Sequence, residues 1–278
     1  MKRAAIVIAV LGMCTWNLAQ DKTATQSAPA GQTATAPQGK RPPAAKTQPE
    51  FDAYKAALPL TDPAATEKAA DDFAAKFPDS ELRVVLYKSA MQKYQSANNG
   101  DKMLEMAQKA LTLDPDDPDA LVGVAQVLAE RTRETDLDKD QKLAEAKKDA
   151  ERALVTVDTD VPTAGYPPER IDQFKRYMKS EAYAVLGTLA TNAKSWPEAE
   201  TDLRKSIDVF PEQVDSVAVL RLAVALDMQN KIPDALKFAN QAVDLTKDRP
   251  DSAAGKAARA EQDRLTKLSS GSAPGQKN

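Results

Sequence analysis

The chain has 278 residues, with 38 lysines and arginines against 41 aspartates and glutamates, no histidine, and one cysteine, Cys14. Without histidine and with a lone cysteine, no histidine-based acid–base pair, no cysteine nucleophile and no histidine–cysteine metal site is expected. The mildly acidic charge, without a basic patch, argues against binding to nucleic acid or to an anionic membrane surface. Aromatic residues make up 5% of the chain and glycine is scarce, which favours helices over sheets.

Residues 1–20 have the features of a secretory signal peptide. Lys2 and Arg3 form a positive start, and the apolar run that follows them is too short to span a bilayer. Cleavage near Ala19-Gln20 would release a periplasmic or secreted protein. Because of Cys14, the segment is also compatible with a lipoprotein signal, and membrane association is expected only if this cysteine is lipidated.

Residues 21–48 are rich in Ala, Thr, Gln and Pro and contain almost no large apolar side chain, which predicts a disordered, flexible linker. Folded structure is expected over 49–268. It begins with a short helix around Phe51 and Tyr54 and a second helix that ends before Pro78. Residues 269–278 are expected to form a disordered tail.

Apolar residues at helical spacing then predict a series of helix pairs. The first runs from Tyr87 to Pro115. The second, from Leu121 to Ala153, is lengthened by an insertion near 132–142. Three alternating aspartates in that insertion resemble the start of a calcium-binding loop, but Gln141 stands where such a loop needs glycine, so no metal site is expected. A second insertion near 159–168 precedes the next helix.

The clearest unit is 180–211, with Tyr183, Leu186, Gly187 and Ala190 on its first helix and Ala199, Leu203, Ser206 and Pro211 on its second. This pattern resembles the tetratricopeptide repeat (TPR). Small Gly187 is expected to let the second helix approach closely, and Leu186 to be buried. A further pair covers Val219 to Ala242, and a polar helix over 252–268 is expected to cap the array.

The resemblance implies an all-α fold in which TPR-like helical hairpins form a short right-handed superhelix, an α-solenoid. It also implies that the first helix of each repeat lines a concave groove that binds a protein or peptide. Transferred to this sequence, the expected groove residues are Lys88, Gln92, Gln95, Gln126, Glu130, Thr188, Thr191, Asn192, Leu220, Val224 and Met228.

The sequence thus predicts an exported, non-catalytic scaffold that binds a protein or peptide partner and requires neither metal nor cofactor. One alternative is a structural subunit of an outer-membrane assembly, held by a lipid on Cys14. A second alternative is an enzyme that uses paired carboxylates on glycans, although no pair of acidic residues stands out from the solvated helix faces.

Overall fold

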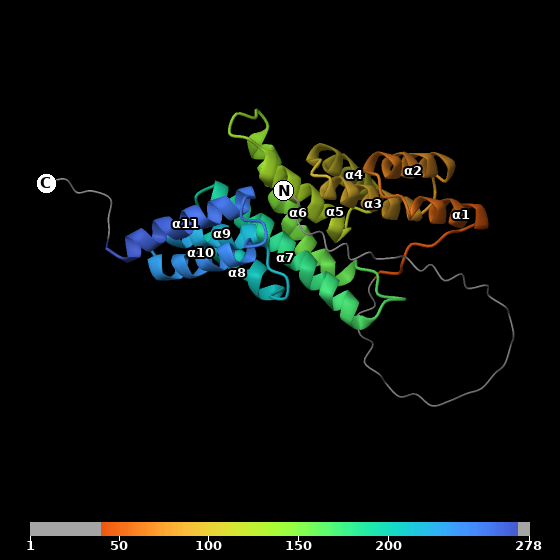
Figure 1. Cartoon of the computed structure of the whole chain (residues 1–278). Helices are drawn as coiled ribbons and strands as arrows, with labels where there is room; N and C mark the ends of the chain where they lie inside the picture. The colour runs from red at the N-terminus through yellow and green to blue at the C-terminus, as the bar shows by residue number, and fades with distance from the viewer. Residues whose placement is uncertain (1–39, 272–278) are drawn as a thin grey trace, which may run out of the picture.

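A computed structural model describes residues 40–271. The predicted signal peptide, the linker as far as residue 39 and the tail from residue 272 lie outside the described residues. Between Lys40 and Gly271 the chain forms eleven α-helices and no strand (Figure 1). Their bounds are α1 Gln48–Ala57, α2 Pro63–Lys76, α3 Leu82–Ser96, α4 Gly100–Leu113, α5 Pro118–Arg131, α6 Lys139–Thr159, α7 Pro168–Asn192, α8 Trp196–Val209, α9 Ser216–Asp227, α10 Ile232–Leu245 and α11 Ala253–Ser269.

Each helix packs mainly against the helices next to it in sequence, as in an array of helical hairpins. The expected all-α solenoid is therefore confirmed. None of the described helices is long and apolar enough to cross a membrane.

The turns between paired helices repeat one geometry. Asn98, Lys194 and Asn230 follow α3, α7 and α9, and each has a left-handed backbone with φ between 57° and 59°. The next residue donates its N–H five residues back, from Asn99 to Tyr94 and from Ser195 to Ala190, for example. This is the hydrogen-bond pattern of a Schellman cap, which satisfies carbonyl groups that a helix end leaves free. Three hairpins are thus closed by the same local structure.

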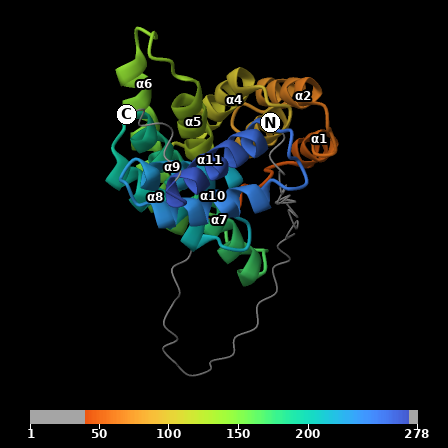
Figure 2. The same ribbon diagram turned by 60° about the vertical axis from the view of Figure 1, so that its left-hand side comes forward.

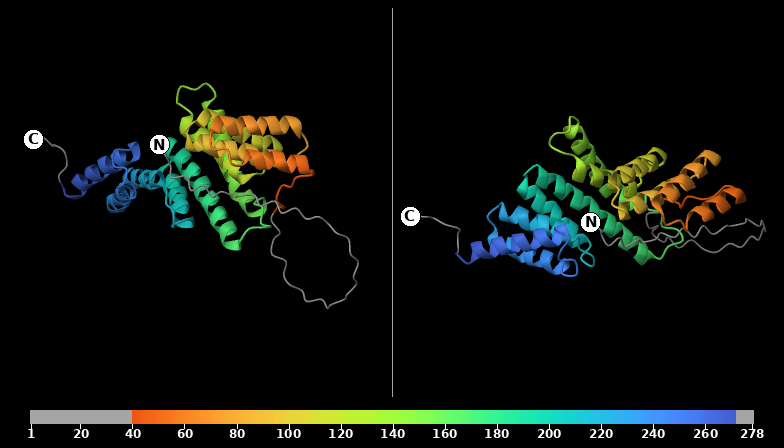
Figure 3. Two further views of the ribbon diagram at one scale, coloured as in Figure 1. Left: turned by 45° about the vertical axis from the view of Figure 1, so that its right-hand side comes forward. Right: turned by 45° about the horizontal axis from the view of Figure 1, so that its top comes forward.

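Helix α7 joins two parts of the core. Its Val185 belongs to the large apolar cluster of α1–α6, which also contains Tyr54, Leu86 and Met106. Its Ala190 belongs to a second cluster with Leu203, Leu222 and Leu265 from the helices that follow. The two groups of helices lie on either side of α7 (Figure 3). Helix α7 therefore contributes apolar side chains to both core clusters.

The close approach expected at Gly187 is present. A Cβ atom on Gly187 would lie 2.5 Å from Cγ of Leu203 and 3.2 Å from the Leu203 backbone nitrogen. Leu203 is fully buried. Leu186, in contrast, is only partly buried, and it packs against the cluster of α1–α6. The expectation that Leu186 is buried is therefore wrong, because the α7–α8 contact is made by the glycine and Leu203.

The second insertion forms the connection between α6 and α7, and the first is partly helical. The first adds the connection 132–138 and lengthens α6 to 21 residues, so that this end of the hairpin projects beyond its neighbours (Figures 1 and 2). Leu137 at its tip is completely exposed. Lys142 pairs with Asp138 at 2.9 Å and with Asp136 at 3.7 Å. Among residues 40–271 no group of three or more acidic, histidine or cysteine side chains is placed to hold a metal ion.

The predicted linker extends too far at its C-terminal end. Residues 40–47 lie against the helices, where Lys40 pairs with Asp114 and Lys46 donates to the Asp79 carbonyl oxygen. Thr47 also caps α1 in a capping box with Glu50. Composition alone suggested disorder because it ignores contacts with residues distant in sequence, such as those of Lys40 with Asp114 and of Lys46 with Asp79.

Gly187→Leu is expected to destabilise the protein by about 1–3 kcal/mol, because the added side chain overlaps both Leu203 and its backbone. Thermal and urea unfolding measure the effect. Ala144→Leu on the exposed side of α6 is the matched control and should leave the midpoint nearly unchanged. Equal stability of Gly187→Leu and wild type would contradict the close packing of α7 on α8.

Candidate functional site

The first helices of the four successive pairs, α3, α5, α7 and α9, form a shared surface, called here the A-helix face. All eleven residues predicted from the TPR resemblance lie on these helices or, for Met228, at the residue that ends α9. The sequence therefore assigned them to the correct elements. Their side chains nevertheless differ in what they contact.

Polar residues of α3 bind residues at the start of α5 and within it. The Lys88 ammonium lies 2.7 Å from an Asp117 oxygen and 3.9 Å from an Asp119 oxygen. Gln92 donates to Asp119 at 3.1 Å, and Gln95 donates to Gln126 at 3.4 Å. These predicted groove residues thus hold neighbouring repeats together, which reduces their capacity to bind a partner.

Two carboxylates share the Lys88 ammonium group. Asp117 is buried and also caps α5 by accepting the Ala120 N–H at 3.0 Å. Burial raises the pKa of Asp119, and the like charge of Asp117 opposes its ionisation as well. Burial alone would lower the pKa of Lys88, but the two carboxylates outweigh that effect and raise it. Lys88 therefore stays charged between the two aspartates.

The centre of the A-helix face contains a small depression of about 10 Å³ between α5, α7 and α9. Gln126, Glu130 and Thr188 line it, together with Glu181 and Arg221. A space of that size holds no more than a water molecule. A partner at this position must lie on the surface rather than insert a side chain.

The remaining polar residues on α7 mostly bind backbone groups. Thr188 and Thr191 donate to carbonyl oxygens one turn back in their own helix, at 2.8 and 2.7 Å. Asn192 reaches across to the Ala129 carbonyl of α5 at 3.3 Å. As on α3, these side chains already form hydrogen bonds within the protein.

The apolar end of the face is on α9. Leu220 packs in a cluster with Val219, Ala242 and Ala258, which lie on α9, α10 and α11. Val224 is half-buried, and Met228 is 54% exposed. The predicted apolar strip is therefore partly used for packing, and its exposed part is concentrated at the C-terminal end of α9.

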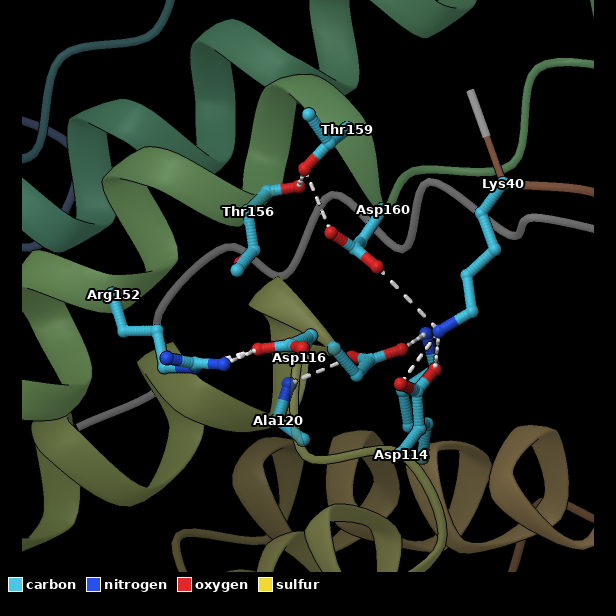
Figure 4. Close-up of polar contacts among 10 residues, drawn as sticks. Lys40, Asp114, Asp116, Ala120, Arg152, Thr156, Thr159 and Asp160 are labelled. Atoms are coloured by element: carbon cyan, nitrogen blue, oxygen red, sulfur yellow. Dashed lines mark hydrogen bonds and ion pairs between the residues drawn. The ribbon is translucent and has the colours of Figure 1, made fainter. Parts of the chain in front are cut away.

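Sequence reasoning missed one polar cluster at the edge of the array. Lys40 lies 2.6 Å from Asp114 and 3.6 Å from Asp160, and Arg152 donates to Asp116 at 2.6 Å (Figure 4). The available signal was charge: the run Lys40-Arg41 and the acidic turn 114–119 are complementary. Their proximity depends on how the repeats stack, which no local pattern specifies.

Lys88→Met is expected to lower the free energy of unfolding by about 1–3 kcal/mol at pH 7.5, because it leaves Asp117 and Asp119 without their cation in a partly buried site. The deficit should shrink near pH 5, since the raised pKa of Asp119 allows protonation to relieve the repulsion. Urea unfolding at both pH values measures it.

Lys68→Met is the matched control for Lys88→Met. It removes an exposed ion pair with Asp72 and should change stability by less than about 0.5 kcal/mol. Equal effects of the two substitutions would show that the Lys88 cluster does not stabilise the α3–α5 contact.

No protein-family model and no curated protein sequence matches this chain. Among solved structures, the chain is similar to the assembly chaperone of RpL4 (Acl4), residues 1–338. The TM-score is 0.40 and the sequence identity 13%, over 80% of this chain and 98% of that chain.

Proposed function

We propose that this protein is a TPR-type scaffold without catalytic activity, exported to the periplasm or cell envelope, that binds a protein or peptide partner on the A-helix face. The observation that carries the proposal is the shared surface of α3, α5, α7 and α9, to which each hairpin contributes one helix. Stacked repeats of this kind serve as extended binding surfaces. The absence of histidine from the whole sequence adds support, since histidine is the commonest acid–base catalyst.

Within the A-helix face, the C-terminal end of α9 is the part best suited to a partner. The polar residues of α3 and α7 already bind neighbouring helices or their own backbone. Met228 is exposed beside half-buried Val224. A flexible thioether adapts to partners of different shape, and exposed apolar groups gain from being covered.

A photoreactive residue at Met228 should crosslink to a discrete partner in intact cells. A second variant carries the photoreactive residue at exposed Ser96 instead, so that crosslinking does not depend on Met228. Adding Val224→Ser and Met228→Ser to this Ser96 variant should lower the recovery of crosslinked partner at least tenfold and leave the melting temperature nearly unchanged. Leu245→Ser with Leu268→Ser is the matched control, because it removes two similarly exposed apolar residues outside the A-helix face. If the first pair unfolds the protein, these residues are core and the proposed contact is wrong.

Export is tested at the N-terminus of the mature protein. Sequencing of protein from the producing cells should give a start between Gln20 and Thr23 if the signal peptide is cleaved as proposed. A start at Cys14, with retention of labelled palmitate, would favour the lipid-anchored subunit instead. A full-length protein retained in the cytoplasm would contradict both.

A further inference from the structure

The segment 40–46, here called the N-terminal strap, lies across three successive connections between helical hairpins. The Lys40 N–H donates to the Thr159 carbonyl at the end of α6 at 3.1 Å, and its ammonium pairs with Asp114 between α4 and α5 at 2.6 Å. Arg41 pairs with Glu81 between α2 and α3. Lys46 donates to the Asp79 carbonyl in the same connection at 2.8 Å. From Lys40 to Lys46, the strap therefore passes the hairpin connections in the reverse of their order in the sequence.

The strap has the chemistry of a short linear ligand. Its sequence is Lys-Arg-Pro-Pro-Ala-Ala-Lys, and no residue of it is in a helix. Pro42 and Pro43 fix an extended backbone and lack N–H donors, so cationic side chains supply much of the contact. These ion pairs are solvent-accessible, since the side chains of Lys40 and Arg41 are 40% and 67% exposed. Pairs of this kind are weak and screened by salt, so the strap is displaceable.

The edge beneath the strap is acidic when the strap itself is not counted. The carboxylates of Asp114 and Asp160 pair with Lys40, and the carboxylate of Glu81 pairs with Arg41. A peptide that displaces the strap would find these three carboxylates without the cations that pair with them. Charge complementarity thus selects a cationic partner.

One further feature shows that the strap does not fill the edge. A groove of about 420 Å³ remains between the strap and the α2–α3 and α4–α5 connections, and its lining includes Pro43, Ser80, Arg83 and Leu113. A segment longer than the strap has room there for contacts that the strap leaves unmade.

We propose that this edge docks an extended segment of a partner protein that carries lysine or arginine, and that the N-terminal strap occupies it until such a partner displaces it. The surface is distinct from the A-helix face, so the inference goes beyond the proposed function. Because the strap is part of the same chain, its high effective concentration competes with the partner. Weakening the strap should therefore strengthen partner binding.

The test uses the full chain and a fluorescent synthetic peptide with the strap sequence, and measures Kd by fluorescence anisotropy. Lys40→Gln with Arg41→Gln should bind the peptide at least tenfold more tightly than wild type, because the competitor has lost its charges. Adding Asp114→Asn and Asp160→Asn to that variant should weaken binding at least tenfold. Lys247→Gln with Lys256→Gln is the matched control: it makes the same change in net charge at exposed positions away from the edge and should leave Kd unchanged.

Melting curves establish that each variant is folded, and the single substitution Lys40→Gln replaces the double variant if the latter melts early. Equal affinities of wild type and the strap variant would overturn the proposal, as would binding that survives loss of Asp114 and Asp160. Formation of dimers that the strap substitutions abolish, seen by sedimentation, would assign the edge to a second copy of this chain instead. A peptide with glutamine in place of its lysines and arginine should not bind, and its binding would contradict charge recognition.

Discussion

The packing of α7 is the constraint on which the rest of the array depends. Val185 of this helix lies in the core cluster of α1–α6, and Ala190 lies in the cluster of the later helices. Between them, Gly187 lets α8 approach until Leu203 fills the space that any larger side chain would need. No single hairpin buries enough apolar surface to be stable alone, so a helix shared by two clusters makes the halves interdependent.

Stacking also determines which polar residues remain available for binding. The side chains that face the neighbouring repeat form hydrogen bonds and ion pairs, as Lys88 does with Asp117 and Gln95 does with Gln126. A buried polar group without a partner costs free energy, so these contacts hold adjacent helices in register. Side chains used in these contacts are not available to a partner. Under the proposed function, binding therefore depends on exposed positions such as Met228, which lies outside the helix-to-helix contacts.

The two candidate binding surfaces differ in their physics. The end of the A-helix face is apolar and adaptable, and its contacts depend little on salt. The edge beneath the N-terminal strap is acidic and already holds a basic segment of the same chain through exposed ion pairs. Salt would weaken binding at the edge and leave binding at the end of the A-helix face nearly unchanged, which separates the two surfaces experimentally.

The helices, their order and both insertions were predictable from the sequence, because apolar spacing, proline positions and capping residues act locally. Pro78 is an example: it predicted the end of the second helix, and α2 ends at Lys76. Only the tertiary structure decided that Lys88 lies between Asp117 and Asp119, that Leu203 rather than Leu186 fills the α7–α8 contact, and that Lys40 reaches Asp114. These contacts join residues distant in sequence, and the way the repeats stack determines which of them meet.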